Sequence, residues 1–242
     1  MDLLTKDTFF NGLISVRQSQ NGYRFSIDSV LLAGHVDTYS GAGVVDLGTG
    51  CGIIPLILAS RYPKIKIYGI EIQKQLSQIA QLNVDENHME ESISIICKDM
   101  KVLQKSDLSG QIDLITSNPP YRKNNSGRIS TNKQKAVAKH EIKATLSDVI
   151  ETAGRMLDIS GRLLIIYPAE RMVDVLSQMR AFCIEPKKIR LVHSRKHEEA
   201  KLTIVEGTKG GRPGVKISHP LIIYKKNGDY TDETKKMYAL VT

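Results

Sequence analysis

The chain has 242 residues and carries 34 lysines and arginines against 26 aspartates and glutamates, which gives a formal net charge of +8. A hydrophobic content of 41% excludes a disordered chain, and the length suffices for one large α/β domain with a buried core. The sequence has no run of eighteen apolar residues and no basic stretch leading into an apolar one near its start, so we expect neither a membrane-spanning helix nor a secretion signal. Three cysteines without a CxxC pair suit a reducing cytoplasm and argue against structural zinc. We therefore expect a cytoplasmic protein without a metal site.

The positive charge is concentrated in two segments. Residues 122–143 hold seven lysines and arginines and one acid, and residues 185–226 hold eleven and four, so the rest of the chain has a net charge of −5. A single lysine-rich segment is usually a solvated face. Two such segments on an acidic body favour a polyanionic partner, and nucleic acid above all.

The first 42 residues predict a hairpin and a short helix packed on the main domain. Residues 13–17 and 23–25 are strand-like, and Asn21-Gly22 between them is a strong hairpin signal. Asp28 follows as a candidate cap for an apolar helix over residues 29–35.

From residue 43 onward, short apolar strands alternate with helices, which predicts an α/β fold with a doubly wound, parallel sheet. The expected strands are 44–47, 65–70, 92–96, 113–116, 162–167, 188–192, 202–206 and 221–224, and the expected helices are 53–61, 73–87, 145–158 and 170–181. We assign residues 43–226 to the main domain and residues 227–242 to a C-terminal tail.

A glycine-rich turn follows the first strand of the main domain. Its sequence is Asp46-Leu-Gly-Thr-Gly-Cys-Gly, in which Gly48, Gly50 and Gly52 allow the backbone to approach a ligand closely, with Thr49 between the first two. The GxGxG spacing differs from the GxGxxG dinucleotide fingerprint, and an acid ahead of it suits a cationic ammonium better than a pyrophosphate. S-adenosylmethionine therefore fits this turn better than NAD.

Two further acids follow the next two strands. Glu71 lies 21 positions after Gly50, where a carboxylate can accept hydrogen bonds from both ribose hydroxyls of an adenosine-containing ligand. Asp99, after the third strand, can receive the adenine amino group or cap a helix.

The tetrapeptide Asn118-Pro119-Pro120-Tyr121 follows the fourth strand, at the edge where open α/β sheets bind ligands. The amino group of adenine is a poor nucleophile because its lone pair is delocalised into the ring. Two acceptors on its N–H groups, the Asn118 side-chain oxygen and the Pro119 carbonyl, would free that lone pair, and the two prolines preorganise the carbonyl. Tyr121 then offers a ring on which a base can stack. We expect these four residues to be the catalytic ones.

The glycine turn together with Asn-Pro-Pro-Tyr resembles class I SAM-dependent methyltransferases that methylate amino groups. The chain also resembles, over nearly its whole length, the bacterial valine-tRNA adenine-N6 methyltransferases. The segments that carry this narrower resemblance are residues 22–29, 139–141 and 209–214. The resemblance implies a Rossmann-like fold with a mostly parallel sheet, an antiparallel last strand and a short N-terminal hairpin. It also implies SAM as methyl donor, a cofactor pocket that includes Phe25 and Asp28, and methylation of the adenosine just 3′ of an anticodon. The chain has Lys139-His-Glu where the family has Arg-His-Glu, and lysine lacks the planar fork of arginine.

Three other functions stay open. Glutamine-N5 methyltransferases share the tetrapeptide, because a side-chain amide and an adenine amino group pose the same lone-pair problem. DNA adenine methylation and a catalytically silent RNA-binding protein are the others. We favour tRNA as partner and a monomer as the oligomeric state.

Overall fold

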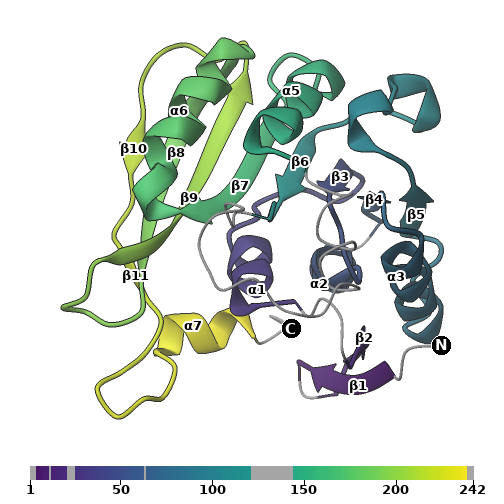
Figure 1. Ribbon diagram of the computed structural model, residues 1–242, viewed down its shortest axis with the longest axis horizontal. Coiled ribbons are helices and arrows are strands. Elements are labelled where there is room, and N and C mark those ends of the chain that lie inside the picture. The colour runs from purple at the N-terminus through teal and green to yellow at the C-terminus, as the bar shows by residue number, and fades with distance from the viewer. Residues whose placement is uncertain (1–3, 11, 21–24, 63, 121–143, 239–242) are drawn as a thin grey trace, which may run out of the picture.

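The centre of the fold is a parallel sheet built from short, β-branched and apolar runs. The computed structural model describes residues 4–10, 12–20, 25–62, 64–120 and 144–238. Five parallel strands lie in the spatial order β5-β4-β3-β6-β7 (Figure 1), and their bounds are Gly43–Leu47 (β3), Lys66–Glu71 (β4), Ile93–Cys97 (β5), Leu114–Ser117 (β6) and Arg162–Pro168 (β7). Strand order reverses between β3 and β6, because β4 and β5 extend to one side of β3 while β6 and β7 extend to the other. In open α/β sheets, this reversal point is where ligands bind.

The C-terminal strands complete the sheet on the far side of β7. They are β8 (Ile184–His193), β9 (Ala200–Lys209), β10 (Lys216–Ile217) and β11 (Leu221–Ile222). Strand β9 lies between β7 and β8 and is antiparallel to both, while β10 and β11 pair in parallel with β8. The sheet has the expected antiparallel strand, but it is β9 and not the last strand, since β11 pairs in parallel with β8.

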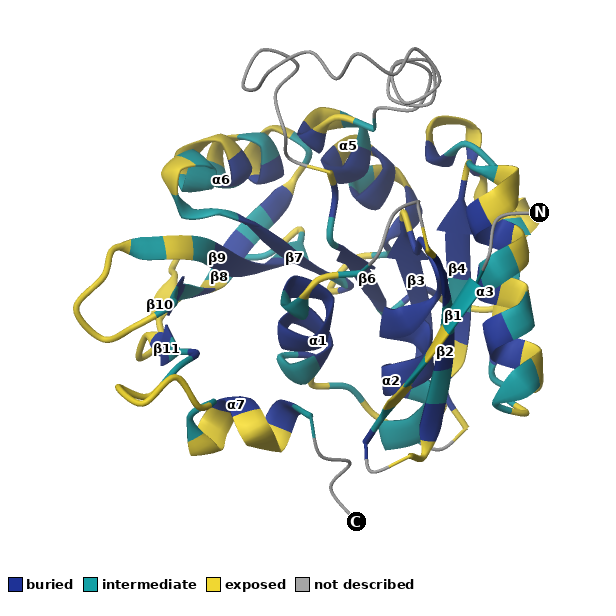
Figure 2. Cartoon of the chain, turned by 60° about the horizontal axis from the view of Figure 1, so that its bottom comes forward, coloured by how far each residue is buried: buried dark blue, intermediate teal, exposed yellow. Residues whose placement is uncertain are grey.

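Helices cover both faces of the sheet (Figure 2). The helices α1 (Ile27–Gly34), α2 (Ile53–Arg61) and α3 (Lys74–Glu86) cover one face, and α5 (Leu146–Met156) and α6 (Met172–Ala181) cover the other. Side chains alternate along each strand, so Val44 packs in the first core and Val45 in the second, both fully buried. Short 3-10 turns cover 100–102, 105–107 and 169–171. The predicted α/β, doubly wound architecture is confirmed.

The N-terminal hairpin exists, but not where the sequence placed it. Its strands are β1 (Leu4–Phe9) and β2 (Ile14–Ser19), and its turn uses Phe10 and Gly12, both with positive φ. Asn21-Gly22, the predicted turn, lies outside the described residues. Ile14, Val16 and Phe10 are buried against α2 and the rest of the first core, because only this register turns the apolar side of β2 inward.

Two helix boundaries also differ from the prediction. Helix α1 begins after Ser26, so Asp28 is a buried residue in its first turn and not its cap. Within the expected C-terminal tail, helix α7 (Asp232–Met237) begins at Thr231, whose hydroxyl accepts a hydrogen bond from the Thr234 amide. Acids in the first turn and lysines in the last turn of α7 are the signal that could have identified it. The domain boundaries themselves stay a prediction.

Candidate functional site

The predicted site residues lie along one edge of the sheet, at the carboxyl ends of adjacent strands. Asn118 follows β6, the glycine turn follows β3, Glu71 ends β4 and Asp99 follows β5. In the register of the sheet, Asp46 on β3 lies opposite Thr116 on β6 and Gly69 on β4. The turn after β3 and the tetrapeptide after β6 therefore lie on the two sides of the reversal point.

The glycine turn has the backbone conformation that its sequence predicted. Gly48, Gly50 and Gly52 have φ values of +76°, +59° and +83°, which side chains resist. The amides of Gly48 and Thr49 donate to the Ile70 carbonyl at 2.9 and 3.0 Å, which ties the turn to β4. A Cβ at Gly48 would meet no atom within 4 Å, so open space lies above the turn for a ligand.

Glu71 holds this turn from the neighbouring strand. Its carboxylate accepts hydrogen bonds from the Gly50 amide at 3.0 Å and from the Gln73 amide at 2.9 Å. Burial raises the pKa of Glu71, and these amides act in the opposite direction by stabilising the charged form. Each carboxylate oxygen still has acceptor capacity for a ribose hydroxyl. The next residue, Ile72, is an apolar side chain that is 42% exposed.

Asp46 is fully buried, and one of its oxygens has no hydrogen-bond partner among the described residues. Oδ1 accepts a hydrogen bond from the Thr116 hydroxyl at 2.8 Å, whereas no described residue donates to Oδ2. Burial raises the pKa of Asp46 to about 6, and the hydrogen bond from the Thr116 hydroxyl acts in the opposite direction. A buried acceptor left unpaired is costly. A cationic ammonium next to the turn would satisfy Oδ2, so this acid fits the amino-acid end of S-adenosylmethionine.

Asn118 is held in place by helix α1. Its side-chain amide Nδ2 donates to the Ser29 hydroxyl at 3.0 Å. This contact joins the N-terminal segment to the tetrapeptide and leaves Oδ1 without a donor among the described residues. Ser117 beside it donates from its hydroxyl to the Leu47 carbonyl at 2.8 Å, so the end of β6 is anchored to β3. Oδ1 of Asn118 is the acceptor that the sequence predicts for a substrate amine.

The remaining predicted residues have mixed placements. Asp99 caps the turn at 100–102, because its carboxylate accepts a hydrogen bond from the Lys101 amide at 3.0 Å. Capping was one of the two roles that the sequence predicted for Asp99, and contact with the adenine amino group was the other. Phe25 is partly buried and packs edge-on against Phe9 with ring centroids 5.1 Å apart, and its place in the cofactor pocket stays a prediction. Pro119 is buried and Pro120 is exposed, while Tyr121, with Lys139 and its neighbours, lies outside the described residues.

Sequence reasoning missed two residues at this edge. Ser29 is buried in the first turn of α1, far from Asn118 in sequence, and no local pattern announces their contact. Ile72 could have been found, because an apolar residue directly after a ligand-binding carboxylate at a strand end is a candidate contact for an adenine face.

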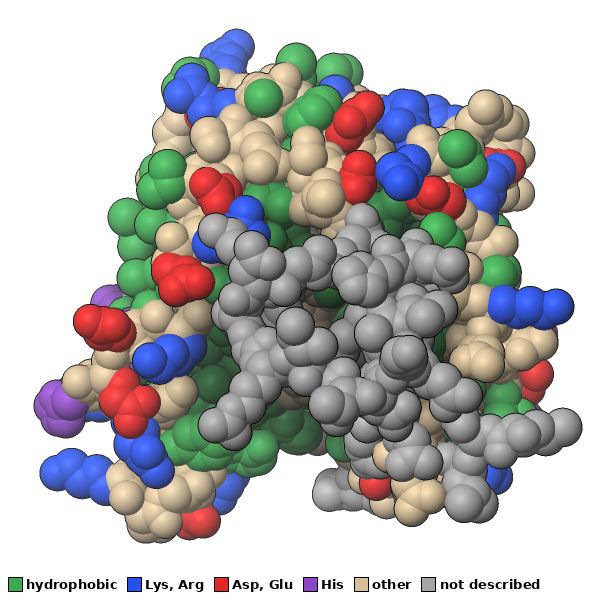
Figure 3. All heavy atoms as spheres, viewed as in Figure 1, with side chains coloured by type: hydrophobic (Ala, Val, Ile, Leu, Met, Phe, Trp, Pro, Cys, Tyr) green, Lys and Arg blue, Asp and Glu red, His purple; other side chains and the backbone are tan. Residues whose placement is uncertain are grey.

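The second basic segment, residues 185–226, does not present all of its positive charges to solvent. The Arg190 guanidinium bonds His35, the His219 carbonyl and Glu233, and the Lys209 ammonium donates to the Gly154 carbonyl at 2.7 Å. On the face drawn in Figure 3, lysines and arginines are interspersed with acids and form no single patch. Several cations of this segment therefore stabilise the fold and are not free for a polyanion.

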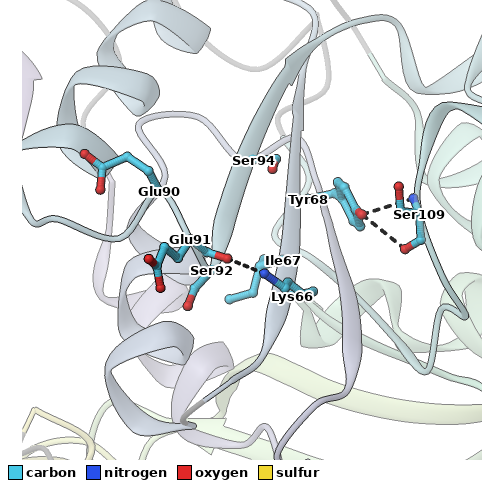
Figure 4. A pocket seen from close by; sticks show the side chains of 8 residues that line it. All are labelled: Lys66, Ile67, Tyr68, Glu90, Glu91, Ser92, Ser94 and Ser109. Atoms are coloured by element: carbon cyan, nitrogen blue, oxygen red, sulfur yellow. Dashed lines mark hydrogen bonds between the residues drawn. The ribbon is translucent and has the colours of Figure 1, made fainter.

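One pocket of the described residues lies away from the site. It has a volume of about 460 Å³ and opens beside the amino ends of β4 and β5 (Figure 4). Its polar groups bind one another: the Lys66 ammonium donates to the Glu91 carbonyl, and the Tyr68 hydroxyl bonds the backbone of Ser109. It lies at the opposite edge from the glycine turn and contains none of the predicted residues.

Within the residues that the structure describes, no group of three or more histidine, cysteine or acidic side chains could hold a metal ion. No helix in the same part of the chain is long and apolar enough to cross a membrane.

The strand order, with a glycine turn and an Asn-Pro-Pro segment on either side of its reversal point, places the protein among the class I SAM-dependent methyltransferases, as the sequence predicted. The chain belongs to the family described as methyltransferase small domain, whose sequence profile matches residues 22–183. S-adenosylmethionine is accordingly its methyl donor.

Several curated relatives are similar over most of the chain. A tRNA1(Val) (adenine(37)-N6)-methyltransferase from Histophilus somni is 28% identical over 92% of this chain and 91% of its own length. A protein of the same name from Porphyromonas gingivalis is 28% identical over 75% of this chain and 72% of its own length. Among solved structures, a predicted O-methyltransferase from Agrobacterium tumefaciens has a TM-score of 0.70 at 20% identity, covering 88% of this chain and 98% of the other. That structure supports the fold.

Proposed function

We propose that this protein transfers a methyl group to the exocyclic N6 of an adenosine in tRNA, next to the anticodon. The observation that carries the proposal is Asn118, whose side-chain amide is held by Ser29 at the reversal point of the sheet, while no described residue donates to its side-chain oxygen. The names of the relatives from Histophilus somni and Porphyromonas gingivalis support the choice of tRNA and of adenine.

The chemistry follows from the acceptors at the end of β6. When bound, S-adenosylmethionine supplies an electrophilic methyl group on a positively charged sulfur. Oδ1 of Asn118 and the carbonyl of Pro119 accept the two N–H groups of the target amine, which localises its lone pair on nitrogen. In-line alignment of that lone pair with the methyl carbon provides much of the rate acceleration. The N–CH3 bond would form as the S–CH3 bond breaks, which would leave S-adenosylhomocysteine as a neutral thioether, and the nitrogen would then release one proton to water.

The other predicted residues bind the two substrates. Asp46 accepts the ammonium, Glu71 the ribose hydroxyls, and Asp99 the adenine amino group of the cofactor, with the glycine turn beneath them. Asp28 lines the same pocket from α1. Tyr121 stacks on the target base after it leaves its helical stack.

The decisive assay is transfer of tritiated methyl groups from S-adenosylmethionine into total tRNA, followed by nucleoside analysis. We expect label in N6-methyladenosine. A parallel assay replaces the tRNA with a release-factor peptide. Label in the glutamine of that peptide at a comparable rate would instead support a protein methyltransferase. RNA binding without methyl transfer would support a catalytically silent RNA-binding protein.

Asn118→Ala tests the amine-positioning role. Because Asn118 acts on the target amine, we expect turnover to fall by a factor of at least about 100 while the Kd for S-adenosylmethionine changes little. Equal loss of cofactor affinity and turnover would remove Asn118 from this role.

Charge reversal tests the RNA contact. Reversal of Lys133 and Lys135 should raise the KM for tRNA and flatten its dependence on salt, since each lost phosphate contact reduces the slope. Reversal of Lys64 and Lys66, at the opposite edge of the sheet, is the matched control and should leave both unchanged. Identical effects of the two pairs would contradict the proposed interface.

A further inference from the structure

On the edge of β2 that faces away from β1, backbone N–H and C=O groups are bonded by two asparagine side chains. Among the described residues, no third strand pairs with this edge. The Asn83 side chain accepts from the Arg17 amide at 2.7 Å and donates to the Arg17 carbonyl at 3.0 Å. One turn later, the Asn87 side chain accepts from the Ser15 amide at 2.9 Å and donates to the Ser15 carbonyl at 2.7 Å. Helix α3 thus pairs with β2 through two side-chain amides that mimic a neighbouring strand.

The spacing of the two elements explains why this pairing works. Residues four apart in a helix are separated by about 6 Å along its axis, and alternate residues of a strand by about 6.8 Å. Alternate residues of an antiparallel strand also point their N–H and C=O groups to the same side. Two amides four residues apart therefore match Ser15 and Arg17 without distortion. An ion pair between Arg17 and Glu86, with the Nε and Oε1 atoms 2.6 Å apart, lies beside them.

Asn83 makes one contact that Asn87 does not. Its Nδ2 also donates to the Cys51 carbonyl at 2.8 Å, inside the glycine turn. One turn earlier on α3, Ala80 packs under Gly52, where an added Cβ would lie 3.4 Å from the Ala80 Cβ. Asn83 is completely buried, so water cannot replace these hydrogen bonds. The same side chain thus binds the hairpin and the turn.

We propose that Asn83 is a positioning residue for the cofactor-binding turn, and that through it the N-terminal hairpin holds the turn in its binding conformation. This inference rests on the proposed role of the glycine turn in binding S-adenosylmethionine. The Cys51 carbonyl directly precedes the Gly52 N-cap of α2, so its orientation determines the path of the chain through Gly50 and Gly52. The Asn83 side chain holds the Cys51 carbonyl, and the Glu71 carboxylate holds the Gly50 amide.

The matched pair Asn83→Ala and Asn87→Ala tests the proposal. Both variants lose an amide pair with β2, but only Asn83→Ala also loses the bond to the turn. We expect the Kd for S-adenosylmethionine, measured by calorimetry on the full chain well below the unfolding temperature, to rise about tenfold or more in Asn83→Ala, which corresponds to about 1.4 kcal/mol. It should stay within about twofold of wild type in Asn87→Ala, a difference within about 0.4 kcal/mol. The KM for tRNA should be unchanged in both. Equal shifts of the cofactor Kd in the two variants, or no shift in Asn83→Ala, would overturn the inference.

A measurement on the wild-type protein covers the case in which Asn83→Ala does not fold. Because coupling is reciprocal, saturating S-adenosylmethionine should slow hydrogen exchange at the Ser15 and Arg17 amides, while exchange in α7 stays constant. Unchanged exchange in β2 would contradict the coupling. If wild type bound no cofactor, or if Glu71→Ala left binding intact, the assignment of the turn itself would be at fault; cofactor binding without the Asn83 effect refutes only this inference.

Discussion

Asp46 gives a prediction with a definite magnitude. Its pKa is about 6 in the folded protein against an ordinary value of 3.8, because burial removes water from its carboxylate. The folded protein therefore holds this proton more tightly than the unfolded chain does. The stability that results is complete below the ordinary pKa and is lost as the pH rises through about 6.

The size of the effect follows from the shift. About two units at 1.36 kcal/mol each give about 3 kcal/mol, or a change of about 6–12 °C in Tm for a chain of this size. Asp46→Asn has no proton to lose at this position, while the other titrating groups are shared with wild type. The free energy of unfolding of Asp46→Asn, relative to wild type, should therefore increase by about 3 kcal/mol between about pH 3 and pH 8.

Urea denaturation of the cofactor-free protein, followed by circular dichroism at several pH values, measures this difference directly. Parallel pH profiles for the two proteins would refute the reasoning, because they would mean that Asp46 titrates alike in the folded and unfolded states. The same substitution should weaken binding of S-adenosylmethionine, since the ammonium loses its charged partner. A variant whose stability relative to wild type rises toward pH 8, yet which binds cofactor poorly, is the expected signature of a binding acid that costs stability.

Three further predictions concern single side chains. Ser29→Ala should lower kcat without raising the KM for S-adenosylmethionine, because Asn118 loses its anchor, and Ser29→Thr should restore much of it; an equal loss in both variants would point to packing instead. Glu71→Gln should raise the Kd for the cofactor by about tenfold or more, as a charged acceptor for ribose is lost, and an unchanged Kd would remove Glu71 from the ribose. Burial lowers the pKa of His35, and Arg190 lowers it further while the Leu31 carbonyl and Glu233 raise it. The neutral His35 ring accepts a hydrogen bond from Arg190, so the stability it contributes is present above its ordinary pKa of 6.5 and is lost as the pH falls through the lowered value. In urea titrations at several pH values, His35→Gln should therefore reduce the fall in the free energy of unfolding toward acid pH. An unaltered fall would exclude His35 as its cause.

Much of the site could be predicted because its signals are local. Asp46 and the three glycines are contiguous, Glu71 ends an apolar run, and Asn118 directly follows another. Parallel strands place all their carboxyl ends at one edge, so knowing which residues end strands was enough to predict that these groups meet. The same logic located the helices of the main domain to within a few residues, since each combines an apolar stripe with a turn signal.

The rest depended on contacts between residues distant in sequence. The register of the hairpin formed by β1 and β2 follows from packing of Ile14 and Val16 against the core, and both contact residues distant in sequence. The net charge of residues 185–226 can be counted from the sequence. Which of these cations can contact a polyanion depends on the fold, because Arg190 binds Glu233 and Lys209 binds the Gly154 carbonyl.

The amino-acid sequence by itself determined the class of protein, the methyl donor and the residues at the strand ends, because those depend on short patterns of glycine, proline and acids. Only the tertiary structure decided what holds them. Ser29 reaches Asn118 across 89 positions and Asn83 reaches Cys51 across 32, and no periodicity along the chain encodes such pairs. Hydrogen bonds of this kind form only after the apolar faces of the helices have packed on the sheet, which is why they must be read from the fold.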